Sequence, residues 1–246
     1  MIFLFTDFGH QGPYVGQMHA VLAVRAPGVP IIDLMHDAPA HDPRAAAYLL
    51  AALACDFPAG SVCCAVVDPG VGTERPPVVL DADGRWYVGP GNGLFELIRR
   101  RAKSCREHVV RWRPERLSAS FHGRDLFAPV AARLAGDGGP TADWLGAGVE
   151  TRAGADWPDD LAEVVYVDRF GNLMSGLRAA NIAATAVLEL DGHAVRHART
   201  FGDAPAGAVF WYENSSGLVE IAMPNASAAA ALDAGAGSRI AVAAPC

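Results

Sequence analysis

Aspartates stand at the ends of several apolar runs that are typical of buried strands. Asp7 follows "MIFLFT", Asp33 lies in "IIDL", Asp68 follows "CCAVV" and Asp168 follows "VVYV". In open α/β sheets, ligands bind beyond the carboxyl ends of the strands. We therefore expect Asp7, Asp33 and Asp68 to meet at one edge of a sheet. The alternative is that each aspartate caps the turn or helix that follows it.

The stretch "VVDPGVGTERP", residues 66–76, carries Asp68, a run of small turn-forming residues and Arg75. Glycines permit tight turns and a close approach of the backbone to other groups. Such a turn can bring the Arg75 guanidinium back to the Asp68 carboxylate. The pair would then either serve a reactive site or stiffen the loop as a salt bridge.

A histidine lies in "SFHGRDLFAPVAARL", where His122, Arg124 and Asp125 surround a glycine before an apolar helix begins. The unperturbed pKa of histidine lies nearest neutrality, so a positioned imidazole can move a proton or orient a water molecule. A single histidine is more often structural. Together with a strand-end aspartate and an arginine, His122 becomes a candidate catalytic residue.

Several common motifs do not occur. "GVGTER" does not match the P-loop pattern, and no G-x-G-x-x-G opens a helix after the first apolar run. No G-x-S-x-G sequence is present either, which weakens the case for a serine hydrolase. The sequence therefore does not indicate an ordinary kinase, P-loop NTPase or nicotinamide dehydrogenase.

Composition and charge restrict the class of protein further. With 51% hydrophobic and 19% charged residues, the 246-residue chain has the composition of a compact folded protein. Its net charge of −7 argues against a nucleic-acid partner, because phosphate binders usually have a basic surface. No run is long and apolar enough for a signal peptide or a membrane span. Five cysteines without metal-ligand spacing fit reduced thiols, so we expect a cytoplasmic protein.

Strand and helix patterns alternate in the first part of the chain. "MIFLFT" and "PIIDL" flank the helical pattern "YVGQMHAVLAVRA", and the helical pattern "DPRAAAYLLAALACDFP" precedes the strand-like "SVCCAVV". The basic stretch "IRRRAKSCREHVVRWRPER" has the pattern of a solvated helix followed by a loop. These patterns predict an α/β domain over residues 1–150, with a mostly parallel sheet flanked by helices.

Helical patterns become rare after about residue 155. "EVVYV", "AVLELDGHAV", "GAVFWYEN", "GLVEIAM" and "SRIAVAA" are short β-rich runs separated by turn residues. They predict a smaller all-β domain over residues 158–246, either a barrel or a sandwich. The Gly- and Ala-rich stretch "GAGVETRAGADWP" has no apolar period and marks the boundary between the two domains.

Seven motifs in order resemble the S-adenosylmethionine hydroxide adenosyltransferases, the water-using relatives of the fluorinating and chlorinating enzymes. They are "TDFG" (6–9), "DLMHD" (33–37), "VVDPGVGTER" (66–75), "GNGL" (91–94), "SFHGRDLFAP" (120–129), "VDRFGN" (167–172) and "NSSGLVEIA" (214–222). The resemblance covers nearly the whole chain. It implies hydrolysis of S-adenosyl-L-methionine to adenosine and L-methionine, with no cofactor and no metal.

The resemblance also implies roles for particular residues. The catalytic triad of the family matches Asp68, Arg75 and His122 here, with the aspartate holding a water molecule that attacks the ribose C5′. Asp7 matches the acid that binds the ribose hydroxyls, and Asp168 matches the acid that faces the methionine ammonium. The other matching substrate contacts are Phe170 and Asn172 at adenine, Ser215 at the methionine carboxylate, and the main chain of Asn225 and Ala226.

Members of this family form trimers in which each active site lies between two subunits. The resemblance therefore implies a homotrimer with active sites at its interfaces. The chain departs from the family pattern at Gly91, Gly176 and Ser216, where larger polar residues are usual. The halogenating relatives have a tyrosine in place of Asp68, and a tyrosine and a serine in place of His122 and Gly123. They also have an extra loop for which this chain leaves no room, and both differences favour water as the nucleophile.

Two other functions fit some of the same residues. One is a metal-dependent phosphoesterase, whose ligands would come from Asp7, His10, His36, His41, Asp68, His122 and Asp125. The other is a non-catalytic protein that binds adenosine or S-adenosylmethionine. Chelator resistance of the activity distinguishes the first alternative, and product formation distinguishes the second.

Overall fold

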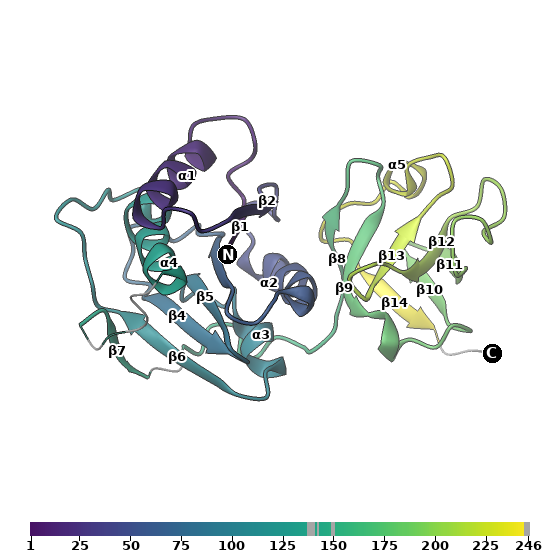
Figure 1. The fold of residues 1–246 in the computed structure, drawn as a ribbon. Helices are drawn as coiled ribbons and strands as arrows, with labels where there is room; N and C mark the ends of the chain where they lie inside the picture. The colour runs from purple at the N-terminus through teal and green to yellow at the C-terminus, as the bar shows by residue number, and fades with distance from the viewer. Residues whose placement is uncertain (137–140, 142, 149–150, 244–246) are drawn as a thin grey trace. The chain divides into compact units, whose positions relative to one another are not determined.

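The computed structural model describes residues 1–136, 141, 143–148 and 151–243. The chain divides into two compact units, Met1–Asp156 and Trp157–Cys246. Each unit has its own sheet (Figure 1). Both sheets have seven strands, and each unit has its own apolar core. The fold class expected from the sequence is confirmed, with a mixed rather than mostly parallel sheet in the first unit.

The sheet of the N-terminal unit has the strand order β2-β1-β3-β5-β4-β6-β7. Its parallel half contains β1 (Ile2–Thr6), β2 (Ile31–Met35), β3 (Val62–Val66) and β5 (Arg85–Pro90). Its antiparallel half adds β4 (Pro77–Ala82), β6 (Cys105–Val110) and β7 (Leu145–Gly148). The carboxyl ends of β1 and β3 are therefore neighbours.

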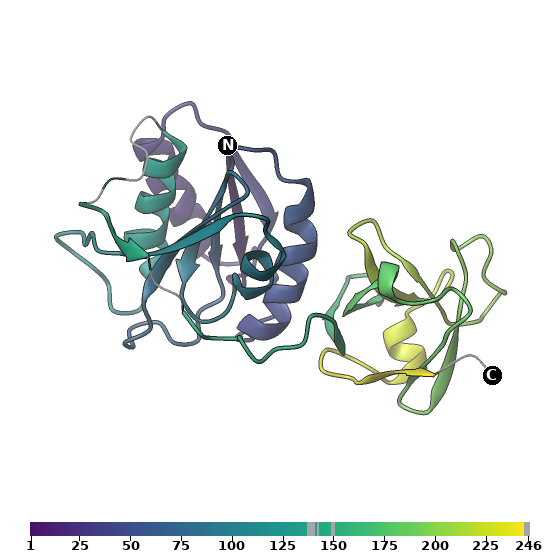
Figure 2. The same ribbon diagram turned by 90° about the horizontal axis from the view of Figure 1, so that it is seen from below.

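Helices cover both faces of this sheet, as Figure 2 shows. On one face, α1 (Tyr14–Arg25) packs against α4 (Ala128–Ala135). On the other face, α2 (Pro43–Leu53) packs against α3 (Glu96–Arg101). Asp42 caps α2 by accepting a hydrogen bond from the Ala45 amide at 3.0 Å, and Pro43 suits the first helical turn because it lacks an N–H.

The basic stretch that was expected to form a helix followed by a loop also contains a strand. Residues Cys105–Val110 form β6, which pairs antiparallel with β4 over five residues from Val78 to Ala82. Arg106 and His108 lie on the face of the sheet that α1 and α4 cover, and Glu107 lies on the opposite face. Because all three residues are polar, the sequence does not show the alternation of apolar and polar residues that is typical of a strand. Val110 joins the buried core.

The C-terminal unit is a nearly closed barrel with the strand order β14-β10-β11-β12-β13-β9-β8. Its strands are β8 (Leu161–Val167), β9 (Leu173–Arg178), β10 (Val187–Leu190), β11 (His193–His197), β12 (Phe210–Glu213), β13 (Leu218–Ala222) and β14 (Ile240–Ala243). Hydrogen bonds from Val164 N–H to Ser238 and from Gly237 N–H to Val164 bring the two edges together. Closure in this way leaves few unpaired edge groups.

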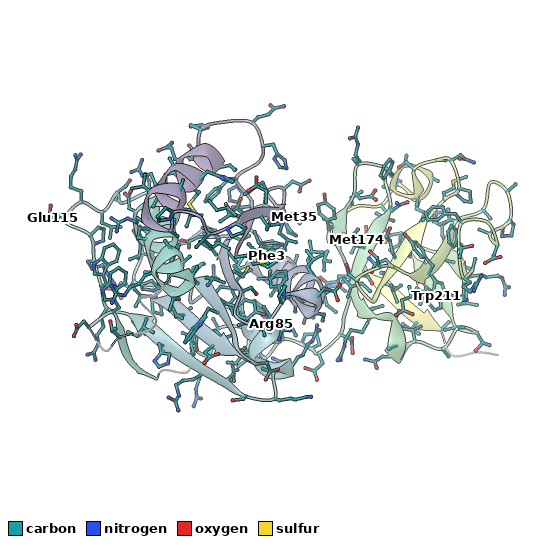
Figure 3. All side chains as sticks on the ribbon, in the orientation of Figure 1. Phe3, Met35, Arg85, Glu115, Met174 and Trp211 are labelled. Atoms are coloured by element: carbon teal, nitrogen blue, oxygen red, sulfur yellow. The ribbon has the colours of Figure 1, made fainter. Side chains whose placement is uncertain are left out.

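The barrel interior is filled by aliphatic side chains together with Trp211 (Figure 3). Trp211 is 2% exposed, and its indole N–H donates a hydrogen bond to the Ala186 carbonyl at 3.2 Å. The short helix α5 (Ala228–Leu232) contributes Ala228 and Leu232 to the same core. No helix among the described residues combines the length and hydropathy that crossing a membrane requires.

Candidate active site

Asp68, Arg75 and His122 come together at the carboxyl end of β3. Arg75 Nε donates to Asp68 Oδ1 at 2.8 Å, and its Nη2 donates to Asp68 Oδ2, so that the pair is bidentate. The same Nη2 lies 3.0 Å from His122 Nδ1. Because a guanidinium only donates hydrogen bonds, His122 Nδ1 is the acceptor, and the neutral imidazole carries its proton on Nε2.

The turn between Asp68 and Arg75 is held by its own hydrogen bonds. The hydroxyl of Thr73 donates to the Gly70 carbonyl at 2.7 Å, and the Val71 amide donates to the Asp68 carbonyl at 3.2 Å. A Cβ at Gly72 would lie 2.7 Å from the Ala119 carbonyl oxygen, and the φ of Gly72 is +81°. Glycine is therefore required here, both for the backbone conformation and for the close packing on the segment that leads to His122.

His122 directly precedes a π-helical turn, η2 (Gly123–Phe127), in which the Ala128 amide bonds the Gly123 carbonyl. A Cβ at Gly123 would come within 3.1 Å of both the Phe8 and the Phe121 rings. The absence of a side chain lets these aromatic residues close on the turn. Phe127, fully buried, also lies under the Arg75 guanidinium, with 5.3 Å between the guanidinium carbon and the ring centroid.

The ion pair borders a pocket of about 280 Å³ in the N-terminal unit. Its volume is close to the lower limit of ordinary small-molecule sites. Its lining combines charged and polar side chains with aromatic and aliphatic ones. The lining residues are Asp7, Phe8, Tyr14, His41, Val66, Asp68, Val71, Ser120, Phe121, His122 and Gly123.

A larger concavity of about 840 Å³ lies over β4, β5, β6 and β7, away from the ion pair. Arg106, His108 and Arg111 give it a basic lining, with Trp86 and Asp81 beside them. It contains none of the residues that the sequence analysis identified as candidates. We therefore place the candidate site at the smaller pocket, where the acid, the guanidinium and the imidazole are joined.

Asp7 and Asp68 line the same pocket, as the positions of their strands suggested, but Asp33 does not. Asp7 Oδ2 accepts a hydrogen bond from the His41 amide at 3.1 Å, and His41 has a left-handed φ of 59°. Asp33, on β2, instead bonds His19 of α1 and His36, which follows β2. The expectation that all three aspartates meet at one edge therefore holds for two of them.

The ring of His122 stands in an environment that disfavours its protonation. Burial lowers the pKa of His122 from its ordinary value of 6.5, and the positive Arg75 guanidinium lowers it further. The Asp68 carboxylate acts in the opposite direction and is the weaker influence. The imidazole is consequently neutral at pH 7.

In the C-terminal unit, Asp168 organises the turn between β8 and β9. Its Oδ1 accepts hydrogen bonds from the amides of Phe170 and Asn172, at 2.8 and 2.9 Å, and its Oδ2 accepts one from Asn172 Nδ2 at 2.9 Å. Asn172 is 8% exposed, whereas Phe170 is 71% exposed. The turn therefore presents an aromatic ring on a rigid backbone, and Oδ2 still has a lone pair for another donor.

The segment around Asn225 and Ala226 lies beside this turn. The Ala229 amide at the start of α5 donates to the Gly171 carbonyl at 2.9 Å, which ties α5 to the turn. Asn225 has a left-handed φ of 58° in the tight turn between Met223 and Ala226, and both candidate residues are exposed. Phe170, Asn172, Asn225 and Ala226 are thus grouped at one end of the barrel.

Ser215 is not part of this group. Its turn precedes Leu218, which pairs with Arg178, whereas the Asp168 turn precedes Leu173, which pairs with Ile221. The two turns therefore stand at opposite ends of the β9–β13 ladder, separated by about 10 Å along β13 and about 16 Å along β9 for a strand rise of about 3.3 Å per residue. Ser215 and Asp168 would have to contact different ends of one long ligand.

A buried acid that the sequence analysis missed supports the Ser215 turn. Glu220, 3% exposed, accepts hydrogen bonds from the Tyr212 hydroxyl at 2.6 Å and from Asn214 Nδ2 at 2.8 Å. Asn214 Oδ1 in turn accepts the amides of Ser216 and Leu218. A charged residue in the apolar run "GLVEIAM" was the signal that could have identified it.

The three positions that depart from the family pattern lie in different surroundings, and close packing explains the small residue at Gly91. A Cβ at Gly91 would lie 2.9 Å from the Pro76 carbonyl oxygen and 2.9 Å from a Val78 methyl group, so a larger residue requires a local shift. Gly176 is buried in β9 opposite Leu161. Ser216 contributes its amide to the bond with Asn214.

The metal-site hypothesis receives no candidate ligand set. Within the part of the chain that the structure describes, no three His, Cys, Asp or Glu residues are grouped so that they could hold a metal ion. The cysteines among these residues are all free thiols, and Cys63 and Cys64 are buried in β3. Cys246 lies outside the described residues.

We predict that Gly72→Ala destabilises the protein more than Gly84→Ala does. Both glycines have a positive φ, but only the Cβ at Gly72 meets another backbone, because no atom lies within 4 Å of a Cβ at Gly84. We expect Gly84→Ala to lower the free energy of unfolding by about 1 kcal/mol and Gly72→Ala to lower it by about 2–3 kcal/mol. Urea denaturation measures both, and equal losses would contradict the packing argument.

We predict that the titration midpoint of His122, followed by NMR of the ring protons, lies below 6.5. Substitution of Arg75 by Gln removes one of the causes of the lowering and leaves the Asp68 carboxylate in place, so the midpoint should rise. Arg111→Gln, which changes an arginine at the larger concavity, is the control and should leave the midpoint where it is. A midpoint that stays unchanged in Arg75→Gln would contradict the assigned cause.

Comparisons with known proteins agree with these features. Residues 2–143 match the SAM hydroxide adenosyltransferase N-terminal domain, and residues 162–241 match the C-terminal domain of the same family. The chain is 42% identical to an (R)-S-adenosyl-L-methionine hydrolase of Thermus thermophilus over 94% of both chains. It is also 42% identical to an (R)-S-adenosyl-L-methionine hydrolase of Salinispora arenicola over 91% of this chain and 90% of the other.

Solved structures resemble the whole chain as well. A conserved protein from Thermotoga maritima, described as uncharacterized, superposes with a TM-score of 0.87 at 27% identity, covering 99% of this chain and all of the other. A conserved hypothetical protein from Thermus thermophilus superposes with a TM-score of 0.77 at 38% identity, covering 98% and 99%. With both of its domains matched in order, the chain belongs to the SAM hydroxide adenosyltransferase family.

Proposed function

We propose that this protein hydrolyses S-adenosyl-L-methionine to adenosine and L-methionine, with Asp68, Arg75 and His122 as its catalytic residues. The observation that carries the proposal is the bidentate Asp68–Arg75 pair, joined to His122 at the edge of a pocket that Asp7 also lines. The 42% identity to (R)-S-adenosyl-L-methionine hydrolases over nearly the whole chain supports it.

The reaction needs a positioned water molecule rather than a strong acid. The oxygen of water forms a bond with the ribose C5′, while the bond between C5′ and sulfur breaks and its electron pair stays on sulfur. Methionine leaves as a neutral thioether, so its departure requires no proton. The proton of the water passes to a carboxylate and then to solvent, and positioning of the water supplies the remaining part of the rate enhancement.

Asp68 is the acceptor of that proton in our proposal. Its side chain is 5% exposed, and Arg75, whose side chain is 10% exposed, stabilises its ionised form through two hydrogen bonds. His122 accepts from Arg75 through Nδ1, so its Nε2–H is a donor. A donor at this position can hold the oxygen of the water while the carboxylate receives the proton.

Substrate binding is distributed over both units in our proposal. Asp7 binds the ribose hydroxyls in the N-terminal unit, where the amide of His41 already fixes one of its oxygens. In the C-terminal unit, Phe170 stacks on adenine and Asn172 hydrogen-bonds to it, with the main chain of Asn225 and Ala226 beside them. Ser215, at the other end of the β9–β13 ladder, binds the methionine carboxylate. Because the methionine ammonium is on the same carbon as that carboxylate, Asp168, whose turn holds the adenine contacts, serves in our proposal to position Asn172 rather than to bind the ammonium.

We further propose a cytoplasmic homotrimer in which the C-terminal unit of one subunit completes the site of another. Residues assigned to one substrate are divided between the two units, and the pocket of the N-terminal unit, at about 280 Å³, is small for the whole of S-adenosylmethionine.

Cys63 and Cys64 are buried thiols, and burial raises the pKa of Cys64 to about 12, which keeps it in the unreactive thiol form.

We predict that chelator-treated protein converts S-adenosyl-L-methionine in oxygen-18 water to adenosine labelled at the 5′ oxygen and unlabelled methionine. Attack of water at C5′ places the label there, and mass spectrometry measures it. Loss of the activity after chelation would instead favour the metal-dependent alternative. Binding without product would favour the non-catalytic binding protein.

We predict that Asp68→Asn lowers kcat at least about 100-fold while the dissociation constant of S-adenosylmethionine changes less than about threefold. The amide keeps the shape of the side chain but is a poor acceptor for a proton. Asp81→Asn, on β4 and outside the pocket, is the matched control and should keep normal turnover. Normal turnover in Asp68→Asn would remove this carboxylate from the mechanism.

We predict that an inactive Asp68→Asn protein and an inactive Asn172→Ala protein regain activity when they are mixed and allowed to exchange subunits. In a symmetric ring whose sites draw one unit from each of two subunits, random mixing restores about a quarter of the sites. Light scattering gives the mass of the same samples. A fully active monomer, or a mixture that stays inactive after exchange, would contradict the shared site.

A further inference from the structure

A chain of hydrogen bonds runs from the surface of β2 to the end of β1. His36, fully buried, has its Nε2 at 2.9 Å from Asp33 Oδ1 and its Nδ1 at 2.8 Å from the Thr6 hydroxyl. Thr6 is also fully buried, and its hydroxyl oxygen accepts the Phe8 amide at 3.3 Å. Two residues of the "DLMHD" motif and one of the "TDFG" motif thus belong to a single chain of contacts.

The chemistry of these groups fixes the direction of the hydrogen bonds. The two imidazoles that bond the Asp33 carboxylate hold its pKa below the ordinary value against the opposing influence of burial, so Asp33 is ionised and only accepts. Nε2 of His36 therefore carries a proton, and in the ring with that single proton Nδ1 accepts from the Thr6 hydroxyl. The Thr6 oxygen is then free to accept from Phe8, so each group determines the orientation of the next.

This chain ends at the backbone of the candidate pocket. Asp7 and Phe8, which follow Thr6 directly, both line the pocket. Backbone hydrogen bonds also join the segment after β1 to the segment after β2. They run from Gly9 N–H to the His36 carbonyl at 2.6 Å and from Ala38 N–H to the Thr6 carbonyl at 3.1 Å. The imidazole of His36 thus spans the two segments from which the Asp7 side chain receives its position.

We propose that Asp33, His36 and Thr6 are positioning residues, which hold the Asp7 carboxylate and the Phe8 ring in the geometry that binds the ribose. The inference rests on the proposed function, because it concerns the binding of the same substrate. Asp33 acts through His36 and Thr6 rather than by contact with a ligand. Its role as part of this chain replaces the role at the sheet edge that its place in the sequence suggested.

The other groups around His36 provide internal controls. His19 Nε2 bonds the same Asp33 oxygen at 2.7 Å from α1, whereas the Thr6 hydroxyl bonds the His36 ring. The His10 ring packs edge-on against the His36 ring, with 5.3 Å between the centroids. A contribution of Asp33 to general stability would involve His19 as much as His36, whereas a positioning role requires His36 and Thr6 alone.

The test compares Thr6→Val, Thr6→Ser and His19→Gln in the full-length protein. Valine keeps the shape of threonine but leaves the buried Nδ1 of His36 without its donor, and serine restores the donor. Titration calorimetry with adenosine, steady-state kinetics with S-adenosylmethionine, and hydrogen exchange of the Phe8 and Gly9 amides are measured on each variant below its melting temperature.

We expect Thr6→Val to raise both the dissociation constant of adenosine and the KM about tenfold, with kcat changed less than about threefold, and to speed exchange of the two amides. Thr6→Ser and His19→Gln should stay within about twofold of the unchanged protein in all three measurements. Unchanged binding and exchange in Thr6→Val would overturn the inference, and so would equal losses in Thr6→Val and His19→Gln.

Failure of the proposed function has a different signature. If the unchanged protein does not hydrolyse S-adenosylmethionine, no kinetic constants can be measured for it or for any variant. Amide exchange at Phe8 and Gly9 then still shows whether the Thr6 hydroxyl holds the loop, and adenosine binding shows whether that loop serves a nucleoside. Unchanged exchange in Thr6→Val overturns the inference in that case as well.

Discussion

The nearly buried ion pair between Asp68 and Arg75 is the constraint on which the site depends. Removing a carboxylate and a guanidinium from water is costly, and the cost is offset only when the geometry is good and the remaining donors find partners. Here two parallel hydrogen bonds join the charges, and His122 accepts from the same guanidinium. The glycines of the connecting turn and the segment that leads to His122 can both be understood as adaptations to this pair.

Other acidic side chains of the candidate site are also held in place by hydrogen-bond donors. Asp7 is held by the His41 amide, Asp168 by the amides of its own turn, and Glu220 by Tyr212 and Asn214. In each case a carboxylate at the end of a strand, or buried within one, fixes a loop through backbone or side-chain donors. Strands supply the positions, and carboxylates turn the irregular segments between them into rigid surfaces.

Local patterns predicted much of the fold but not the direction of its strands. The apolar runs of β1, β2 and β3 and the helical periods of α1 and α2 could be identified because each depends on neighbouring residues. The antiparallel half was missed, although "DADG" marks its first hairpin, where Asp83 and Gly84 have φ values of 49° and 75°. Strand β6 was missed because its central residues Arg106, Glu107 and His108 are polar on both faces of the sheet.

The candidate site shows the same limit. Asp68, Arg75 and His122 could be predicted as a group from their motifs, and the pairing of Arg75 with Asp68 followed from the glycine-rich turn. The partners of Asp33 could not be predicted from the sequence. His19 lies on α1 and His36 follows β2, and only the packing of these elements brings both rings to one carboxylate oxygen. The separation of Ser215 from Asp168 likewise depends on the register of β9 with β13.

The direction of one hydrogen bond assigns the chemical roles within the ion pair. Because Arg75 can only donate, the contact at 3.0 Å makes His122 Nδ1 an acceptor and leaves Nε2 protonated. An imidazole in that form is a donor, and burial beside a cation keeps it from gaining a second proton. The lone pairs of the Asp68 carboxylate are then the basic sites of the cluster, and in the mechanism that we propose the proton of the bound water molecule moves toward them. In that mechanism the guanidinium places both the proposed base and the proposed donor.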